Sequence, residues 1–124
     1  MRRGFEAYAR GDLDTAYSFL HPEIEFHTYA DSPQAGVYSG RDAVRQYNED
    51  LMGQFESVRL EIEEIVDAGE RVVLVSTQHA VPKGGQQEID VHMAEVWTVR
   101  DNLLAERRSY STRAEALEAA GLRE

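Results

Sequence analysis

The sequence of 124 residues lacks cysteine, which excludes a disulfide framework and a thiol nucleophile. It also lacks a long apolar run, because no stretch approaches the roughly 18 residues that a transmembrane helix needs. We therefore expect a soluble, cytoplasmic protein without a membrane partner. The length predicts one domain over residues 1–124, which is large enough to bury a core without disulfides.

Lysine is almost absent, since Lys83 is the single example, and the formal net charge is −10. Nucleic-acid binding draws most of its non-specific affinity from clustered lysine and arginine side chains. The nearest approach to such a cluster is Arg107-Arg108, and a pair is too small to follow a phosphate backbone. The composition predicts no nucleic-acid partner and an acidic surface that serves solubility.

The first half of the sequence predicts three helices and one short strand. Apolar spacing favours a helix over 2–10 and a second helix over 12–20, which His21-Pro22 ends because the residue before proline avoids helical angles. Alternation predicts a strand over 24–29, and Asp31-Ser32-Pro33 and Gly36 mark a loop after it. A third helix begins at 40–42, with an apolar stripe made of Val44, Tyr47, Leu51 and Phe55.

The second half changes to a period of two and predicts four strands joined by short turns. The expected strands span 58–66, 72–81, 89–99 and 103–111. Short turns join neighbouring strands, so the four should form an antiparallel meander. The tail 113–122 predicts a short helix that Gly121 ends. The fold class is therefore α+β, with three helices packed on a curved, mostly antiparallel sheet in the order α-α-β-α-β-β-β-β.

One histidine, His27, lies in a part of the sequence that is rich in aromatic residues. An imidazole has a reference pKa of about 6.5, near neutral pH, which suits a proton-transferring base. Large amphipathic rings around such a group are typical of a small-molecule pocket. The aromatic residues in question are Tyr17, Phe26, Tyr29, Tyr38 and Tyr47.

Four segments of the sequence, together with the element order, resemble a known superfamily. They are Gly11–Asp14, the strand Glu23–His27, the helix entry Tyr38–Val44 and the strand segment Glu95–Val99. With them the whole chain resembles the nuclear transport factor 2-like superfamily, and within it the SnoaL-like polyketide cyclases and ketosteroid isomerase-related proteins.

The resemblance implies a cone-shaped domain whose sheet and helices enclose an apolar cavity. It also implies a homodimer formed through the outer face of the sheet. Members include isomerases, polyketide cyclases and dehydratases that need no cofactor, and also proteins that only bind ligands or partners. Fold alone therefore does not decide between these functions.

Site residues follow from the resemblance one at a time. His27 occupies the place of the isomerase's general base, and Glu95 takes the place of its hydrogen-bonding acid if the following turn is shorter; otherwise Ala94 does. Gly4 stands where the isomerase carries its oxyanion-stabilising tyrosine, and Tyr8 lies one helical turn onward. The polyketide cyclases use a histidine and an aspartate without that tyrosine, so they are the nearer comparison.

Each of these residues also has a purely structural explanation. His27 is either a base or a histidine at a strand end, bonded to a carbonyl or carboxylate. Glu95 is either an acid or the partner of Arg107 or Arg108 on the neighbouring strand. Trp97 is either core or part of the cavity wall. An inward Arg107 would stabilise an enolate or carboxylate, whereas an outward one would lie on the surface or at a dimer interface.

Histidine spacing predicts no metal site. His79 and His92 lie on neighbouring expected strands, but neither they nor His27 form an HxH or HExxH motif.

Tyr47 is core by its helical spacing and matches an aromatic pocket position of the isomerase. The expected substrate-binding residues are Tyr8, Tyr47, Trp97 and Arg107.

The sequence leads to two functional hypotheses. The first is an enzyme without a cofactor that transfers a proton on a small, apolar, carbonyl-containing substrate, as an isomerase, cyclase or dehydratase does. His27 would be the base, and Glu95 would be the acid or its hydrogen-bonding partner. The alternative is a non-catalytic ligand-binding or dimerisation module of the same fold.

Overall fold

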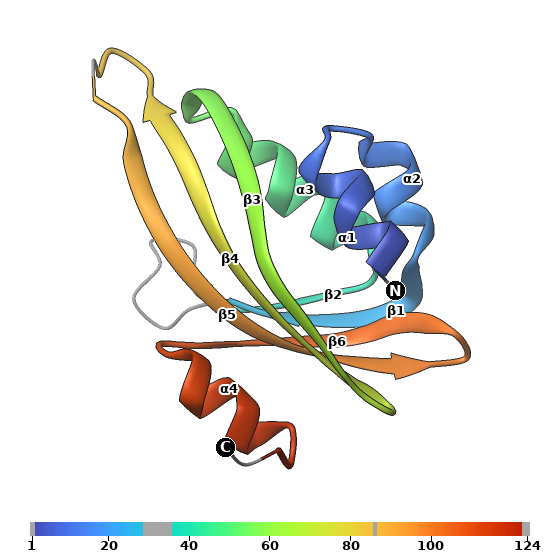
Figure 1. The fold of residues 1–124 in the computed structure, drawn as a ribbon. Helices are drawn as coiled ribbons and strands as arrows, with labels where there is room; N and C mark the ends of the chain where they lie inside the picture. Colours follow the sequence, from blue (N-terminus) through green and yellow to red (C-terminus); the bar gives the residue numbers. More distant parts are fainter. Residues whose placement is uncertain (1, 29–35, 86, 123–124) are drawn as a thin grey trace.

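The computed structural model describes residues 2–28, 36–85 and 87–122 and shows the expected α+β architecture (Figure 1). Three helices cover the concave face of a curved six-stranded sheet, and a fourth lies against its convex face. The helices are α1 (Arg2–Ala9), α2 (Leu13–Ser18), α3 (Arg41–Met52) and α4 (Arg113–Ala119). The strands are β1 (Leu20–His27), β2 (Val37–Ser39), β3 (Phe55–Ala68), β4 (Arg71–Pro82), β5 (Ile89–Arg100) and β6 (Leu103–Tyr110).

The sheet order is β2-β1-β6-β5-β4-β3, so the meander β3–β6 confirms the prediction from alternation. All strand pairs are antiparallel except β1 with β6, which is parallel. The turn between β5 and β6 contains Asp101 and Asn102, which both have positive φ, at 56° and 63°. Asparagine and aspartate tolerate this conformation better than other residues with a side chain, and two such residues make the tight turn that suits a hairpin.

Three local predictions were wrong. The stripe of the third helix does not include Phe55, because α3 ends at Met52 with Gly53 as its C-cap, and Phe55 begins β3. The second helix ends at Ser18, and β1 starts at Leu20, so Pro22 lies inside a strand with a register shift between Leu20 and Glu25. Strand β2 was not predicted. The expected loop residues 31–33 and Tyr29 lie outside the described residues.

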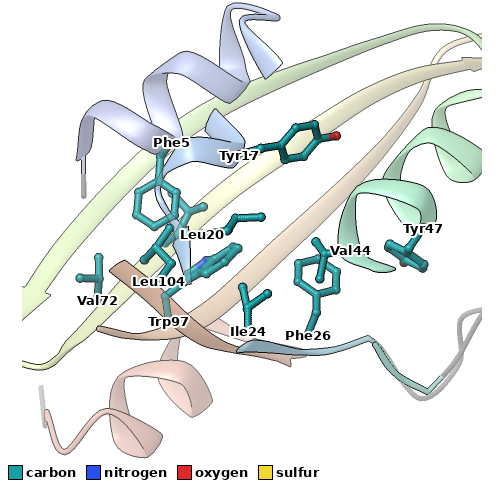
Figure 2. Packing of buried hydrophobic residues seen from close by; sticks show 11 residues of the cluster. Phe5, Tyr17, Leu20, Ile24, Phe26, Val44, Tyr47, Val72, Trp97 and Leu104 are labelled. Atoms are coloured by element: carbon teal, nitrogen blue, oxygen red, sulfur yellow. The ribbon is translucent and has the colours of Figure 1, made fainter. Parts of the chain in front are cut away.

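The main core lies between the concave face and the first three helices (Figure 2). Alternation along β5 sends Trp97 to this face, where its ring centroid lies 5.4 Å from that of Phe5 on α1. Phe26 of β1 points toward α3, with its ring 5.5 Å from that of Tyr47. The concave side is thus an aromatic interior held by one sheet and three helices.

A second core lies on the convex face, under α4. Val73 of β4 and Val96 of β5 contact the apolar side of α4, whose Ala116 and Leu117 are buried. Thr112 caps this helix by accepting a hydrogen bond from the Glu115 amide. None of the described helices has the length and apolar character needed to span a bilayer.

Candidate active site on the concave face

A buried ion pair joins two neighbouring strands on the concave face. Arg107 of β6 donates through Nη1 to Oε2 of Glu95 of β5 at 2.6 Å, and the two residues are only 8% and 4% exposed. The indole Nε1 of Trp97 donates to the other carboxylate oxygen of Glu95 at 3.4 Å. Nη2 of Arg107 donates to the backbone carbonyl of His27 at 3.3 Å. Charge–charge interactions are stronger in such a water-poor interior than at a surface.

Aromatic rings surround this pair. The guanidinium carbon of Arg107 lies 3.5 Å from the centroid of the Phe26 ring, which is its register partner on β1. The Phe26 ring in turn lies 6.1 Å from Trp97 and 5.5 Å from Tyr47. A single charged pair is therefore enclosed by apolar rings, which is typical of a small-molecule site.

Three buried side-chain atoms of the concave face, one of them in Arg107 itself, have no hydrogen-bond partner among the described residues. They are Nε of Arg107, Oγ of Ser109 and Oγ of Ser76. Ser109 is the register partner of Glu95, and Ser76 follows two residues after Leu74, the partner of Glu95 on β4. Alternation places all three side chains on the concave face. Unpaired buried donors are costly, so donors left without a partner on this face are suited to a ligand's hydrogen-bond acceptor.

A second polar network connects helices α1, α2 and α3 through side-chain hydrogen bonds. The hydroxyl of Tyr8 donates to Oδ1 of Asn48 at 2.8 Å, and Nδ2 of Asn48 donates to the hydroxyl of Tyr17 at 2.8 Å. Burial raises the pKa of Tyr8 far above its ordinary value, and the charge of Glu95 raises it further, although the Asn48 hydrogen bond opposes this. Tyr8 therefore stays a neutral phenol within electrostatic range of Glu95 and Arg107.

The structure does not bring the side chains of His27 and Glu95 together. Along β1, Ile24 and Phe26 face the concave core, and alternation turns Glu25 and His27 to the convex face. One imidazole nitrogen of His27 lies within 4.8 Å of carboxylate oxygens of Glu25 and Glu106. Only the backbone carbonyl of His27 reaches the ion pair.

The remaining predicted residues do gather on the concave side. Tyr47 and Trp97 belong to the aromatic interior, Tyr8 borders it, and Arg107 takes the inward one of its two possible orientations. The structure shows the pair between Glu95 and Arg107 that the structural explanation of Glu95 allowed.

The sequence interpretation missed three polar residues of this region. They are Asn48, Ser76 and Ser109. A serine in the apolar run of β4 and an asparagine next to the stripe of α3 were the signals available, because polar residues at core positions usually have a partner or a role.

Two hollows of the described surface lie outside this interior. One of about 650 Å³ lies on the convex side and is lined by residues that include Glu25, Arg100 and Glu106. Another of about 420 Å³ lies beside the start of α3. Along β5 the concave-facing residues change from exposed at Ile89 (48%) and Val91 (44%) to buried at Glu95.

Comparison with known proteins assigns the chain to a family. The family profile of the SnoaL-like domain matches residues 1–107. The chain belongs to the SnoaL-like domain family. The resemblance inferred from the sequence is thereby confirmed, and it accounts for the cone of helices over a curved sheet. Comparison of this SnoaL-like protein with curated proteins gave no significant match.

Solved structures share the fold of this SnoaL-like protein. An NTF2-like protein of unknown function from Burkholderia pseudomallei is 21% identical, with a TM-score of 0.78 over 94% of this chain and 91% of that one. A candidate SnoaL-like polyketide cyclase from Mesorhizobium loti is 20% identical, with a TM-score of 0.72 over 88% and 93%. TerC, co-crystallised with polyporic acid, is 17% identical, with a TM-score of 0.75 over 95% and 92%. At these identities the likeness establishes the fold alone.

Proposed function

We propose that this SnoaL-like protein is an enzyme that transfers a proton on a small, apolar, carbonyl-containing substrate without a cofactor, at the concave face. The observation that carries the proposal is the group of unpartnered donors beside the buried pair of Glu95 and Arg107. A buried ion pair is not a reliable source of stability, whereas charged groups enclosed by apolar walls are a frequent feature of active sites.

In the proposed reaction the substrate's carbonyl oxygen accepts hydrogen bonds from the free Nε–H of Arg107 and the hydroxyl of Ser109. Glu95 takes the proton from the carbon next to the carbonyl, and the electrons of that C–H bond move into an enolate. The enolate's negative charge lies beside the guanidinium of Arg107, which stabilises it. Where the substrate carries a carbon–carbon double bond between its β and γ carbons, the enolate is a conjugated dienolate. Return of the proton from Glu95 to the γ carbon then moves the double bond into conjugation with the carbonyl and completes an isomerisation.

His27 has no part in this reaction through its side chain, because its ring lies on the other face of the sheet. Its backbone carbonyl orients Arg107 by accepting from Nη2. Glu95 therefore replaces His27 as the proposed base, which changes the assignment made from the sequence. The neutral phenol of Tyr8 offers a further polar group on the helix side of the site.

A non-catalytic binding module is the second candidate, and one observation favours it. Both carboxylate oxygens of Glu95 already accept hydrogen bonds, from Arg107 and from Trp97. A base whose lone pairs are engaged must give up one of these bonds before it takes a proton. In this alternative the same interior binds an apolar carbonyl compound and leaves it unchanged.

Solvent-deuterium exchange into apolar ketones distinguishes the two candidates. We would follow 2-tetralone, 4-phenyl-2-butanone and isophorone by NMR in heavy water, with and without the protein. The enzyme proposal predicts exchange above the buffer rate for at least one ketone and a loss of about 100-fold or more in Glu95→Gln, in line with the usual contribution of acid–base catalysis. The variant His27→Gln should exchange as the unmodified protein does.

The opposite results would overturn the proposal. Exchange at the buffer rate for every ketone, with binding intact, would establish the binding module instead. Full exchange activity in Glu95→Gln would remove Glu95 from the mechanism. Polyporic acid, the compound crystallised with TerC, serves as a further binding probe because it combines aromatic rings with acidic enols and carbonyls.

A further inference from the structure

The convex face carries a second group of polar side chains, where β1 and β6 run parallel. Glu25 of β1 and Glu106 of β6 are register partners, and His27 lies two residues beyond Glu25 on the same face. One potential ligand atom from each of the three residues lies within 4.8 Å of the others. Two carboxylates and an imidazole therefore converge from two paired strands of the sheet.

The charges in this group are only partly compensated. Two carboxylates side by side on paired strands repel each other. Nε of Arg108 donates to Glu106 at 3.1 Å, while Glu25 makes no ion pair with any residue that the structure describes. Nε2 of His27 is buried and has no hydrogen-bond partner within the described ranges. A group with surplus negative charge and an unpaired imidazole nitrogen is suited to a cation that accepts nitrogen and oxygen ligands.

A second histidine–carboxylate group on the same face differs in the hydrogen-bond partners of its imidazole nitrogens. His79 contacts Asp90 and Glu88 through Nδ1, at 2.7 and 2.9 Å, and Glu61 through Nε2 at 2.9 Å. Both ring nitrogens of this imidazole are therefore already engaged by carboxylates. His27, by contrast, lacks a hydrogen-bond partner for its Nε2.

We propose that Glu25, His27 and Glu106 bind one divalent first-row transition ion, such as Zn²⁺ or Co²⁺, on the convex face. One histidine and two carboxylates provide three ligands, which is the number that metal sites with an open position use. The hollow of about 650 Å³ includes Glu25 and Glu106 in its lining, so water or a small ligand can complete the coordination. Metal–ligand distances of about 2.1 Å require the exposed carboxylate of Glu25 and the partly exposed carboxylate of Glu106 to close slightly around the ion.

This site was not predicted from the sequence, because the spacing of histidines says nothing of Glu106, which lies on a strand far from His27 in the sequence. It does not depend on the proposed reaction, since the sheet separates it from Glu95 and Arg107. Failure of one proposal therefore leaves the other intact. The variant Arg107→Lys should bind the ion as the unmodified protein does.

Titration of the metal-free protein with Zn²⁺ by calorimetry, and with Co²⁺ by visible absorption, tests the proposal. We expect one saturable site in the unmodified protein and at least a 10-fold weaker affinity in His27→Gln and in Glu106→Gln. His79→Gln, which disrupts the other histidine–carboxylate group, is the matched control and should retain the affinity. Circular dichroism checks that each variant is folded, and Glu106→Gln carries the test if His27→Gln does not fold.

Two results would overturn the proposal. One is the absence of saturable binding of either ion by the unmodified protein. The other is a loss of affinity in His79→Gln while His27→Gln and Glu106→Gln bind normally, which would assign the ion to the other group.

Discussion

At the scale of single residues, Glu95 and Arg107 form an ion pair whose two side chains are both buried. Removing one member of a buried ion pair leaves the other charge without compensation, which usually costs about 3–5 kcal/mol. We predict a loss of this size in the unfolding free energy of Arg107→Met, measured by urea denaturation. The neighbouring Arg108 is exposed and faces the other way, so Arg108→Met should change stability by no more than about 0.5 kcal/mol.

A double variant separates the charge effect from lost packing. Glu95→Met combined with Arg107→Met removes both charges, and apolar replacement of a buried pair is often neutral or stabilising. We expect the double variant to be more stable than Arg107→Met alone. Equal or lower stability of the double variant would mean that Arg107 acts by packing on Phe26 rather than by compensating Glu95.

His79 gives the molecule a pH-dependent contribution to stability. Hydrogen bonds to the carboxylates of Glu61 and Asp90 raise the pKa of His79 above its ordinary value. Because the folded-state pKa is the higher one, the contribution is complete below the unfolded pKa of about 6.5 and disappears as the pH rises through the folded pKa. We predict that His79→Gln destabilises the protein more at pH 5.5 than at pH 9, by denaturant unfolding at both values. An equal effect at the two pH values would contradict this account.

At the scale of secondary-structure elements, alternation predicted the long strands because it repeats over many residues. The meander β3–β6 could be found this way, and so could the inward positions of Trp97 and Glu95. Strand β2 has three residues, too few for a period of two to be recognised. Proline in β1 argued against a strand there, and the register shift after Leu20 accommodates it.

The face of His27 was available from the same alternation. Ile24 and Phe26 are the apolar members of β1, so Glu25 and His27 had to face the other way. The resemblance to the isomerase instead implied a catalytic position for His27 on the concave side. Which polar atoms near Glu95 lack partners could not be predicted, because that depends on three strands meeting in one register.

Helix α1 contains Gly4 at the position where the resemblance to the isomerase implies a tyrosine. A Cβ atom on Gly4 would lie 2.9 Å from Cγ of Phe19, close to the base of that side chain. Glycine-to-alanine substitution in a helix usually stabilises by up to about 1 kcal/mol, whereas overpacking costs about 1–3 kcal/mol. We predict a net loss of stability in Gly4→Ala, measured by urea denaturation.

The variant Phe19→Ala supplies the control for this clash. In that background the new methyl group has space, and the helix preference of alanine should make Gly4→Ala neutral or stabilising. If Gly4→Ala destabilises both backgrounds equally, the contact with Phe19 is not the reason that this position holds glycine.

At the scale of the whole molecule, the convex face differs from the apolar surface that a dimer through the sheet led us to expect. Helix α4 covers its apolar part, and His79 and its carboxylate partners occupy another part. The homodimer stays a prediction, which light scattering checks at micromolar concentration. We predict twice the chain mass of 14.0 kDa. A mass near 14.0 kDa would show that these polar groups and α4 leave no dimer interface.

Both candidate functions require the concave interior around Glu95 and Arg107 to bind apolar carbonyl compounds. Trp97 is the only tryptophan, and its indole N–H contacts Glu95, so one ¹H–¹⁵N signal reports on this site. During titration with 2-tetralone we predict a saturable shift of that signal in the unmodified protein and in Arg108→Lys. Arg107→Lys keeps a cation beside Glu95 but loses the free Nε donor. In this variant the affinity for 2-tetralone, read from the titration, should fall at least 10-fold. No shift in the unmodified protein, or an equal shift in Arg107→Lys, would contradict the account.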